Sequence, residues 1–281
     1  MIGATDRAVE SRVRGSHDGR RKAQASAPVV SAWMLRSFEW YVRRYLRTHF
    51  DRVLLDRGGS EPSRLIGERP LVVYLNHASW WDPLIGLIIA RTQFPQRQHF
   101  APIDAKALEQ FRFFSRLGFF GVEQQTRAGA AQFWSVSTAV LQSHNAALWI
   151  TPQAAFADPR VRPVLLAPGL ARLASRLDGV TILPMAIEYP FWNERLPVAL
   201  ARFGEPLLSD TMISSDEWQI RLSSALEETQ DELAKFAVSR DFTRGTPVIR
   251  GRRRVSVFYD VWRRVLGRSA NVPLVDERGS E

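Results

Sequence analysis

The sequence predicts an α/β fold: a single layered domain in which helices flank a central sheet that is largely parallel or mixed. Apolar runs of strand length alternate with stretches of helical periodicity through the middle of the chain. This alternation is typical of sheets whose parallel strands are joined by helical crossovers. The 281 residues are enough to bury one large core, and 45% of them are hydrophobic, as expected for a globular protein.

An amphipathic helix is predicted ahead of the sheet, within residues 29–57. Over residues 32–50 its apolar face carries four side chains: Met34, Phe38, Tyr41 and Tyr45. The opposite face carries three arginines: Arg36, Arg43 and Arg47. A basic helix with Trp33 and Trp40 nearby suits a membrane interface, where aromatic rings lie at the level of the headgroups. The same stripe can instead pack on the domain core, and the periodicity leaves both interpretations open.

Six apolar runs predict the strands of the sheet, at 71–75, 98–103, 119–123, 146–151, 181–189 and 198–204. Periodic patterns predict the helices, at 83–91, 104–116, 129–143, 167–177 and 214–239. Asp104 can cap the second of these helices, and Gly118 is a stop signal after it. Ser215 can cap the last one. The apolar side of that last helix carries Trp218, Leu222, Leu226 and Leu233.

Both ends of the chain lack the alternating strand and helix patterns of the domain, which we expect to span residues 29–243. Residues 1–28 are polar, basic and rich in small residues, so we expect disorder and no secretory signal. Residues 244–281 are expected to form a basic tail with a short amphipathic helix at 255–266. Between Arg244 and Arg268 lie eight arginines and one aspartate, in a chain of net charge +9. Such a patch suits an anionic membrane surface or an acidic protein. No nucleic-acid-binding module is recognised, so we expect no nucleic-acid partner.

The turn between the strand at 71–75 and the helix at 83–91 carries the most informative motif. Its sequence is Asn76-His77-Ala78-Ser79-Trp80-Trp81-Asp82-Pro83. A neutral imidazole can take a proton near pH 7, and a carboxylate can fix its tautomer and stabilise the imidazolium. Asp82 before Pro83 can also cap the helix. The two roles are compatible because a carboxylate has two oxygens, and ligand sites form at the loops after buried strands.

The sequence resembles the glycerolipid acyltransferase family, typified by lysophosphatidate acyltransferases, over roughly residues 30–240. Asn76, His77 and Asp82 match the family's first motif, N-H-x4-D. Three further blocks follow in the family's order, at 117–123, 149–153 and 182–187, and look like its second motif, its F-P-E-G-T-R motif and its V-P-V-A-I strand. The resemblance implies that His77 and Asp82 are catalytic. It also implies a substrate-binding role for Asn76, Gly121, Pro152 and Gln153, and for Arg127 after the second motif.

This chain departs from the family pattern at two motifs. Where the third motif normally has Glu, Gly, Thr and Arg, the chain has Gln153, Ala154, Ala155 and Phe156. The second motif usually ends in Arg, but here Gln124 holds that place and Arg127 follows three residues later. In the family, those two arginines are associated with the phosphate of the acceptor. Arg160 and Arg162 could replace them, since a guanidinium fork binds phosphate well, or could be ordinary surface arginines.

The resemblance implies acyl transfer from acyl-CoA or acyl carrier protein to a hydroxyl of a lysophospholipid or another glycerolipid. His77 would be the general base, and Asp82 would orient it. The missing arginines keep a neutral acceptor open, such as a glycosylated lipid or a terpenoid (carotenoid-type) alcohol. A hypothesis of another class is a non-catalytic lipid-binding protein, which Gln153 in place of Glu would suit. The intact His77 and Asp82 argue against it.

The composition predicts neither a cofactor nor a metal site. The chain has no cysteine, and its five histidines are scattered without metal-ligand spacing. No stretch reaches the ~18 apolar residues that suggest a transmembrane helix. We therefore expect a cytoplasmic protein bound peripherally to the cytoplasmic face of a membrane.

Overall fold

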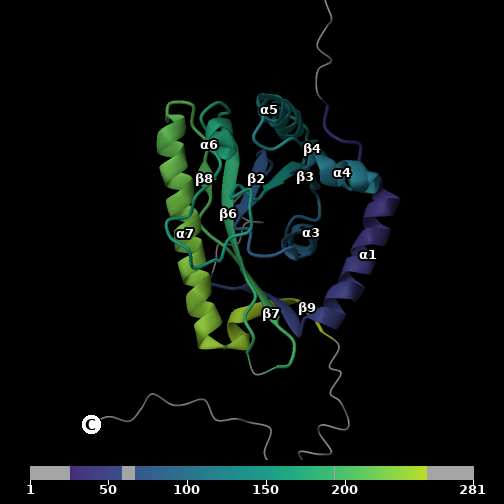
Figure 1. Cartoon of the computed structure of the whole chain (residues 1–281). Helices are drawn as coiled ribbons and strands as arrows, with labels where there is room; N and C mark the ends of the chain where they lie inside the picture. Colours follow the sequence, from purple (N-terminus) through teal and green to yellow (C-terminus); the bar gives the residue numbers. More distant parts are fainter. Residues whose placement is uncertain (1–25, 59–66, 193, 252–281) are drawn as a thin grey trace, which may run out of the picture.

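The structure of the chain is a computed structural model that describes residues 26–58, 67–192 and 194–251 (Figure 1). Within these residues, nine strands form one mixed sheet in the order β4-β3-β5-β2-β6-β7-β1-β9, with β8 paired to β6. Helices cover the sheet, so the predicted α/β layered domain is confirmed. The disorder expected at the N-terminus falls outside the described residues up to residue 25, and so does the tail helix expected at 255–266.

The strands around the turn at residues 76–81 are parallel. The sheet consists of β1 (Arg52–Asp56), β2 (Leu71–Leu75), β3 (Gln98–Asp104), β4 (Phe119–Val122), β5 (Ala146–Ile150), β6 (Thr181–Glu188), β7 (Val198–Phe203), β8 (Leu207–Leu208) and β9 (Gly245–Arg250). From β4 to β6 the neighbours run parallel. β7 is antiparallel to β6 and parallel to β1. Every residue of β2 and β5 is buried, as expected for strands with helices on both faces.

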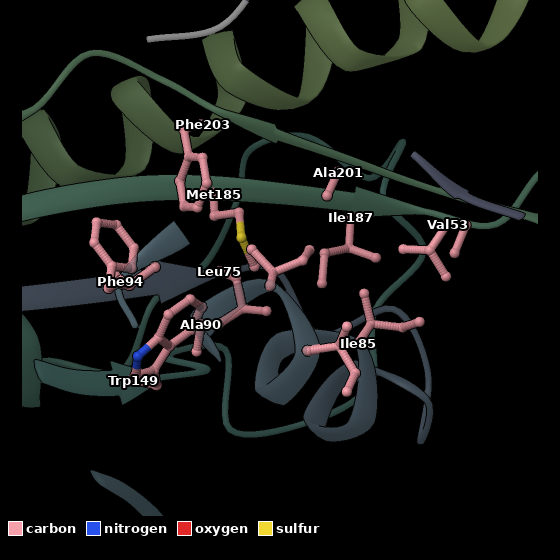
Figure 2. Packing of buried hydrophobic residues seen from close by; sticks show 14 of the residues in the cluster. Val53, Leu75, Ile85, Ala90, Phe94, Trp149, Met185, Ile187, Ala201 and Phe203 are labelled. Atoms are coloured by element: carbon pink, nitrogen blue, oxygen red, sulfur yellow. The ribbon is translucent and has the colours of Figure 1, made fainter. Parts of the chain in front are cut away.

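Two helical layers enclose the sheet. The helices are α1 (Ala32–His49), α3 (Asp82–Gln93), α4 (Ala105–Gln110), α5 (Arg127–Leu141), α6 (Gly169–Ala174) and α7 (Ser215–Ser239), with 3-10 turns η1 (Arg112–Leu117) and η2 (Phe242–Arg244). α1 and α3 pack on one face, against side chains such as Val73 and Leu75. α5, α6 and α7 pack on the other face, against Val72 and Tyr74. Figure 2 shows Ile85 of α3 beneath the strands of the first face.

The N-terminal helix packs on the core, but not through the whole of the predicted apolar face, because Tyr41 of that face is 51% exposed. Val42 and Leu46 are fully buried, and Phe38 packs against the same cluster. Trp33 and Trp40 remain 71% and 68% exposed. The helix ends at His49, well before residue 57, because the chain there turns into strand β1.

The expected boundary between domain and tail at residue 243 is wrong. Residues 245–250 form β9, which pairs antiparallel with β1 and extends the sheet. Its sequence, Gly-Thr-Pro-Val-Ile-Arg, gives little strand signal because it is an edge strand with few buried side chains. The helix expected at 104–116 is also two pieces, α4 and η1. Asp104 caps α4 as predicted, and Gly118 adopts a left-handed φ of 101° at the end of η1.

Candidate active site

The turn at residues 76–81 carries the chain from the end of β2 into α3. Asn76, at its start, is fully buried. Its amide nitrogen donates to the Ile187 carbonyl at 3.0 Å, and its amide oxygen accepts from the Ile187 N–H at 2.8 Å. Asn76 therefore anchors the turn to the end of β6. We expected this residue to bind substrate, but its side-chain amide makes these two structural hydrogen bonds instead.

His77 and Asp82 form a close pair at the carboxyl end of β2. The His77 Nδ1 lies 2.7 Å from Asp82 Oδ2. The aspartate side chain is 0% exposed, whereas the histidine side chain is 19% exposed. An imidazole that donates its Nδ1–H to a carboxylate carries its lone pair on Nε2. The histidine side chain is thus partly open to solvent, whereas the supporting carboxylate is buried.

Two further donors hold the Asp82 carboxylate. The Ser79 N–H donates to Oδ2 at 3.0 Å, and the Tyr189 hydroxyl donates to Oδ1 at 2.6 Å. Asp82 is the first residue of α3, and Trp81 holds the cap position without a side-chain cap bond. The helix-cap interpretation is therefore wrong by one residue. Asp82 points back into the turn, where both its oxygens are engaged.

Tyr189 is a site residue that the sequence did not reveal. It follows β6 directly and packs against Phe50, with ring centroids 5.8 Å apart. Burial, together with the charge of Asp82, raises the pKa of the Tyr189 phenol well above its ordinary value of 10. It therefore stays a hydrogen-bond donor to Asp82 at neutral pH. A polar aromatic residue at the end of a predicted strand was the only signal, and it did not identify the partner.

The loop after β5 holds the backbone of His77. Gln153 Oε1 accepts from the His77 N–H at 2.6 Å, and the Ala157 N–H donates to the His77 carbonyl at 2.9 Å. The exposed Phe156 ring lies over the imidazole, with centroids 4.3 Å apart. Pro152 is buried, and its carbonyl accepts from the Ala167 N–H. The third motif therefore lies beside the first one in space.

Gly121 and Arg127 are not brought to His77. Gly121 lies on β4, and β3 and β5 separate that strand from β2, which places it roughly 14 Å away at the usual strand spacing. A Cβ atom at Gly121 would come within 3.3 Å of Ala105, so this glycine allows α4 to pack closely. Arg127 is exposed at the start of α5.

Arg160 and Arg162 lie on the loop beyond Ala157, and each already has a carboxylate partner. Arg160 donates through Nε and Nη2 to Asp158, at 2.8 and 2.6 Å. Arg162 donates to Asp231 of α7 at 2.5 Å. Both arginines line a cavity between this loop, the end of β6 and α7. In the part of the chain that the structure describes, no group of His, Cys, Asp and Glu side chains is arranged to hold a metal ion.

The fold and this pair define a class: layered α/β proteins with a carboxylate-supported imidazole at the carboxyl edge of a parallel sheet. The acyltransferase family model matches residues 49–188, and the chain belongs to that family. A solved structure with a similar fold is the 1-acyl-sn-glycerophosphate (LPA) acyltransferase PlsC from Thermotoga maritima. It is 15% identical, with a TM-score of 0.51 over 72% of this chain and 80% of that one. A comparison with curated protein sequences finds no match.

Proposed function

We propose that this protein is an O-acyltransferase that moves a fatty acyl group from acyl-CoA or acyl carrier protein to a hydroxyl of a lysophospholipid or another glycerolipid. The observation that carries the proposal is the His77–Asp82 pair, 2.7 Å apart, with its buried carboxylate and its partly exposed imidazole. This arrangement suits removal of a proton from a hydroxyl that approaches from solvent.

In the proposed reaction, Nε2 of His77 takes the proton from the acceptor hydroxyl as its oxygen attacks the thioester carbonyl. Asp82 stabilises the imidazolium that forms. Collapse of the tetrahedral intermediate breaks the carbon–sulfur bond, and the imidazolium returns the proton to the leaving thiol. The step needs no covalent acyl-enzyme and no cofactor.

Gln153 is compatible with this activity. Its Oε1 accepts a hydrogen bond from the His77 N–H, and a carboxylate oxygen of the family's usual glutamate could accept the same bond. The substitution removes a charge near the imidazole but keeps the loop attached to the turn. This contact weakens the non-catalytic alternative, for which the loss of the glutamate was the main argument.

A purified-protein assay tests the proposed activity. The full chain would be incubated with an acyl-CoA or an acyl carrier protein thioester and a mixture of lysophospholipids and neutral lipid alcohols, and the products identified by mass spectrometry. We expect one acyl group to be added to a lipid hydroxyl. Absence of any acylated lipid with both donors would contradict the proposal.

We also propose that the protein works at an anionic membrane surface, on the cytoplasmic face. The support is the exposed aromatic surface of α1, formed by Trp33, Trp40 and Tyr41 beside exposed basic side chains such as Arg36 and Arg47. None of the described helices is long and apolar enough to cross a membrane. An aromatic and basic helix face can bind at the interface without crossing it.

Vesicle sedimentation tests this surface. We expect binding to anionic vesicles that weakens as salt is added, and weaker binding after Arg36→Gln and Arg47→Gln. Trp40→Ala should weaken binding at all salt concentrations, because it removes exposed apolar area. Vesicle binding that is unchanged by all three substitutions would contradict a role for α1.

A further inference from the structure

A cavity of about 610 Å³ adjoins the His77 site, between the loop at residues 159–163, the end of β6 and α7. Cavities of this size hold small molecules or the headgroups of larger ones. Its lining includes Ala186 and Leu233, whose buried side chains leave almost no apolar surface open. No step of the proposed acyl transfer uses this cavity.

Two contacts tie the walls of this cavity to the catalytic turn. The Ala157 N–H donates to the His77 carbonyl, and the Asn76 side chain is bonded to the backbone of Ile187. Pro159, in the wall, follows Ala157 by two residues, so their Cα atoms are at most about 7 Å apart. A lipid headgroup in the cavity could therefore stay attached to a hydroxyl at the imidazole.

The charges around the cavity do not favour an anion. Its lining holds three carboxyl and two guanidinium groups: Glu188, Glu227, Asp231, Arg160 and Arg162. Arg162 is paired with Asp231, and Arg160 is paired with Asp158 just outside the lining. A phosphate entering the cavity would lose water beside these carboxyl groups and would compete with them for each guanidinium.

The hydrogen-bonding groups of the cavity favour hydroxyls instead. Gln230, only 4% exposed, donates from Nε2 to the Pro159 carbonyl at 3.0 Å. Its Oε1 is buried without a hydrogen-bond partner among the described residues, although buried polar atoms normally have one. A hydroxyl can donate to this oxygen, whereas an ionised phosphate offers acceptors only. Burial also raises the pKa of the Glu188 carboxyl, which favours its uncharged form.

We propose that this cavity binds an uncharged, hydroxyl-rich headgroup of the acceptor lipid, of the glycosyl class. The inference rests on the acyltransferase function proposed above and narrows the class of its acceptor. The amide of Gln230 and the carboxyl groups of the lining suit the hydroxyls of a sugar ring. The reaction at His77 is the same for either acceptor.

A competition between acceptors tests the proposal. The purified full chain with an acyl-CoA should acylate a monoacylated glucosyl glycerol about 10-fold faster than lysophosphatidate at equal concentration, because a site built for hydroxyls rejects ligands that leave its polar groups unpaired. Preference for lysophosphatidate would overturn this inference and leave the proposed acyl transfer intact. Acylation of neither lipid, nor of any other in a mixture, with acyl-CoA or with an acyl carrier protein thioester would overturn both.

The substitution Gln230→Leu, with a matched control, tests whether the preference for the glucosyl lipid depends on this cavity. Gln219 on the same helix also donates from Nε2 to a carbonyl, that of Leu166, and also has a buried Oε1 without a partner, but it lies outside the cavity. Gln230→Leu should raise KM for the glucosyl lipid about 10-fold with little change in kcat. Gln219→Leu should leave both unchanged. Equal effects of the two substitutions would overturn the assignment.

Asp231→Asn supplies a gain-of-function test that does not disturb buried groups, since Asp231 is largely exposed. It removes the charge that neutralises Arg162, so the rate with lysophosphatidate should rise several-fold relative to the glucosyl lipid. A relative rate that does not change, with Arg162 no longer paired to a charge, would overturn the electrostatic basis of the proposal.

Discussion

The turn at residues 76–82 and the loop at residues 153–163 contact the same imidazole, but they are held in different ways. In the turn, Asn76 and Asp82 are buried, and their polar atoms are bonded to distant parts of the sheet. In the loop, Phe156 and Arg160 are exposed. The loop also makes long-range contacts, through Gln153 and Arg162, so the two regions differ in burial more than in the reach of their contacts. The turn keeps the family's catalytic residues, whereas the loop departs from the family pattern. We infer that the buried turn holds the residues that carry out the reaction, and that the exposed loop determines which acceptor binds.

Substitution of Asp82 should have the largest effect among the residues that support His77. Asp82→Asn keeps the size of the side chain but removes the charge that stabilises the imidazolium. We expect acyl transfer to slow about 10²-fold. The free energy of unfolding should fall by ~1 to 3 kcal/mol, because the hydrogen bonds to a buried charge are weakened. Single-turnover rates and denaturant unfolding measure the two effects separately. A rate within about threefold of the wild type would show that the pair is not the source of the chemistry.

A buried histidine of the core, away from the site, should make the stability respond to acid. His99 on β3 accepts from the Trp149 indole and lies against the Phe94 carbonyl, and burial lowers its pKa to about 4. Between pH 6.5 and 4 the unfolded chain therefore binds a proton that the native state does not. This contribution to stability is present above pH 6.5 and is lost as the pH falls, by about 3 kcal/mol in total.

His99→Gln isolates this contribution, because glutamine can accept from Trp149 and donate to Phe94 without titrating. Denaturant unfolding at pH 7 and pH 4.5 should show a smaller loss of stability on acidification in the variant. An identical pH dependence in the two proteins would mean that His99 is not held neutral.

Tyr189→Phe tests whether the catalytic turn depends on its distant partner. The substitution keeps the ring that packs on Phe50 but removes the hydroxyl that donates to Asp82. We expect the rate to fall about 10-fold, as for loss of one hydrogen bond to a charged group. Tyr45→Phe is the matched control, since Tyr45 lies in the same aromatic cluster against Trp81. Equal rates for the two variants would remove Tyr189 from the catalytic machinery.

The smallest effect on rate should come from the loop. Phe156 makes a ring contact with His77 but is 63% exposed. Phe156→Ala should therefore change kcat less than about threefold, while KM for the acceptor changes more, because the loop positions the acceptor and not the proton. A fall in kcat as large as that of Asp82→Asn would show that the loop contributes to the reaction as much as the turn does.

The central fold could be predicted because its signals are local. β2 and β5 are buried on both faces, so they appear as unbroken apolar runs. β9 could not be predicted, because an edge strand containing Pro247 and ending in Arg250 lacks that pattern and depends on pairing with β1. The N-terminal helix gave an ambiguous pattern because it has two apolar surfaces. Val42 and Leu46 face the core, while Trp33 and Trp40 face outward.

The candidate site likewise has a part that could be predicted from local sequence and a part that could not. His77 and Asp82 are five residues apart, so their pairing could be predicted from one turn. The contacts that hold them join residues more than 70 positions apart, as between His77 and Gln153, or more than 100, as between Asp82 and Tyr189. Such pairs depend on the order of strands in the sheet, which a single sequence does not encode in any local pattern. The pairing of Arg162 with Asp231 is equally non-local.

The most direct test of the account is the rate of acyl transfer by His77→Ala. The purified variant and the wild type would be compared at equal concentration with an acyl-CoA and the best lipid acceptor, after thermal unfolding shows that both are folded. Loss of a general base should lower the rate by ~10² to 10⁴, more than Asp82→Asn does, with little change in stability because the imidazole is partly exposed. A folded His77→Ala protein that acylates lipid at near the wild-type rate would contradict the proposed chemistry.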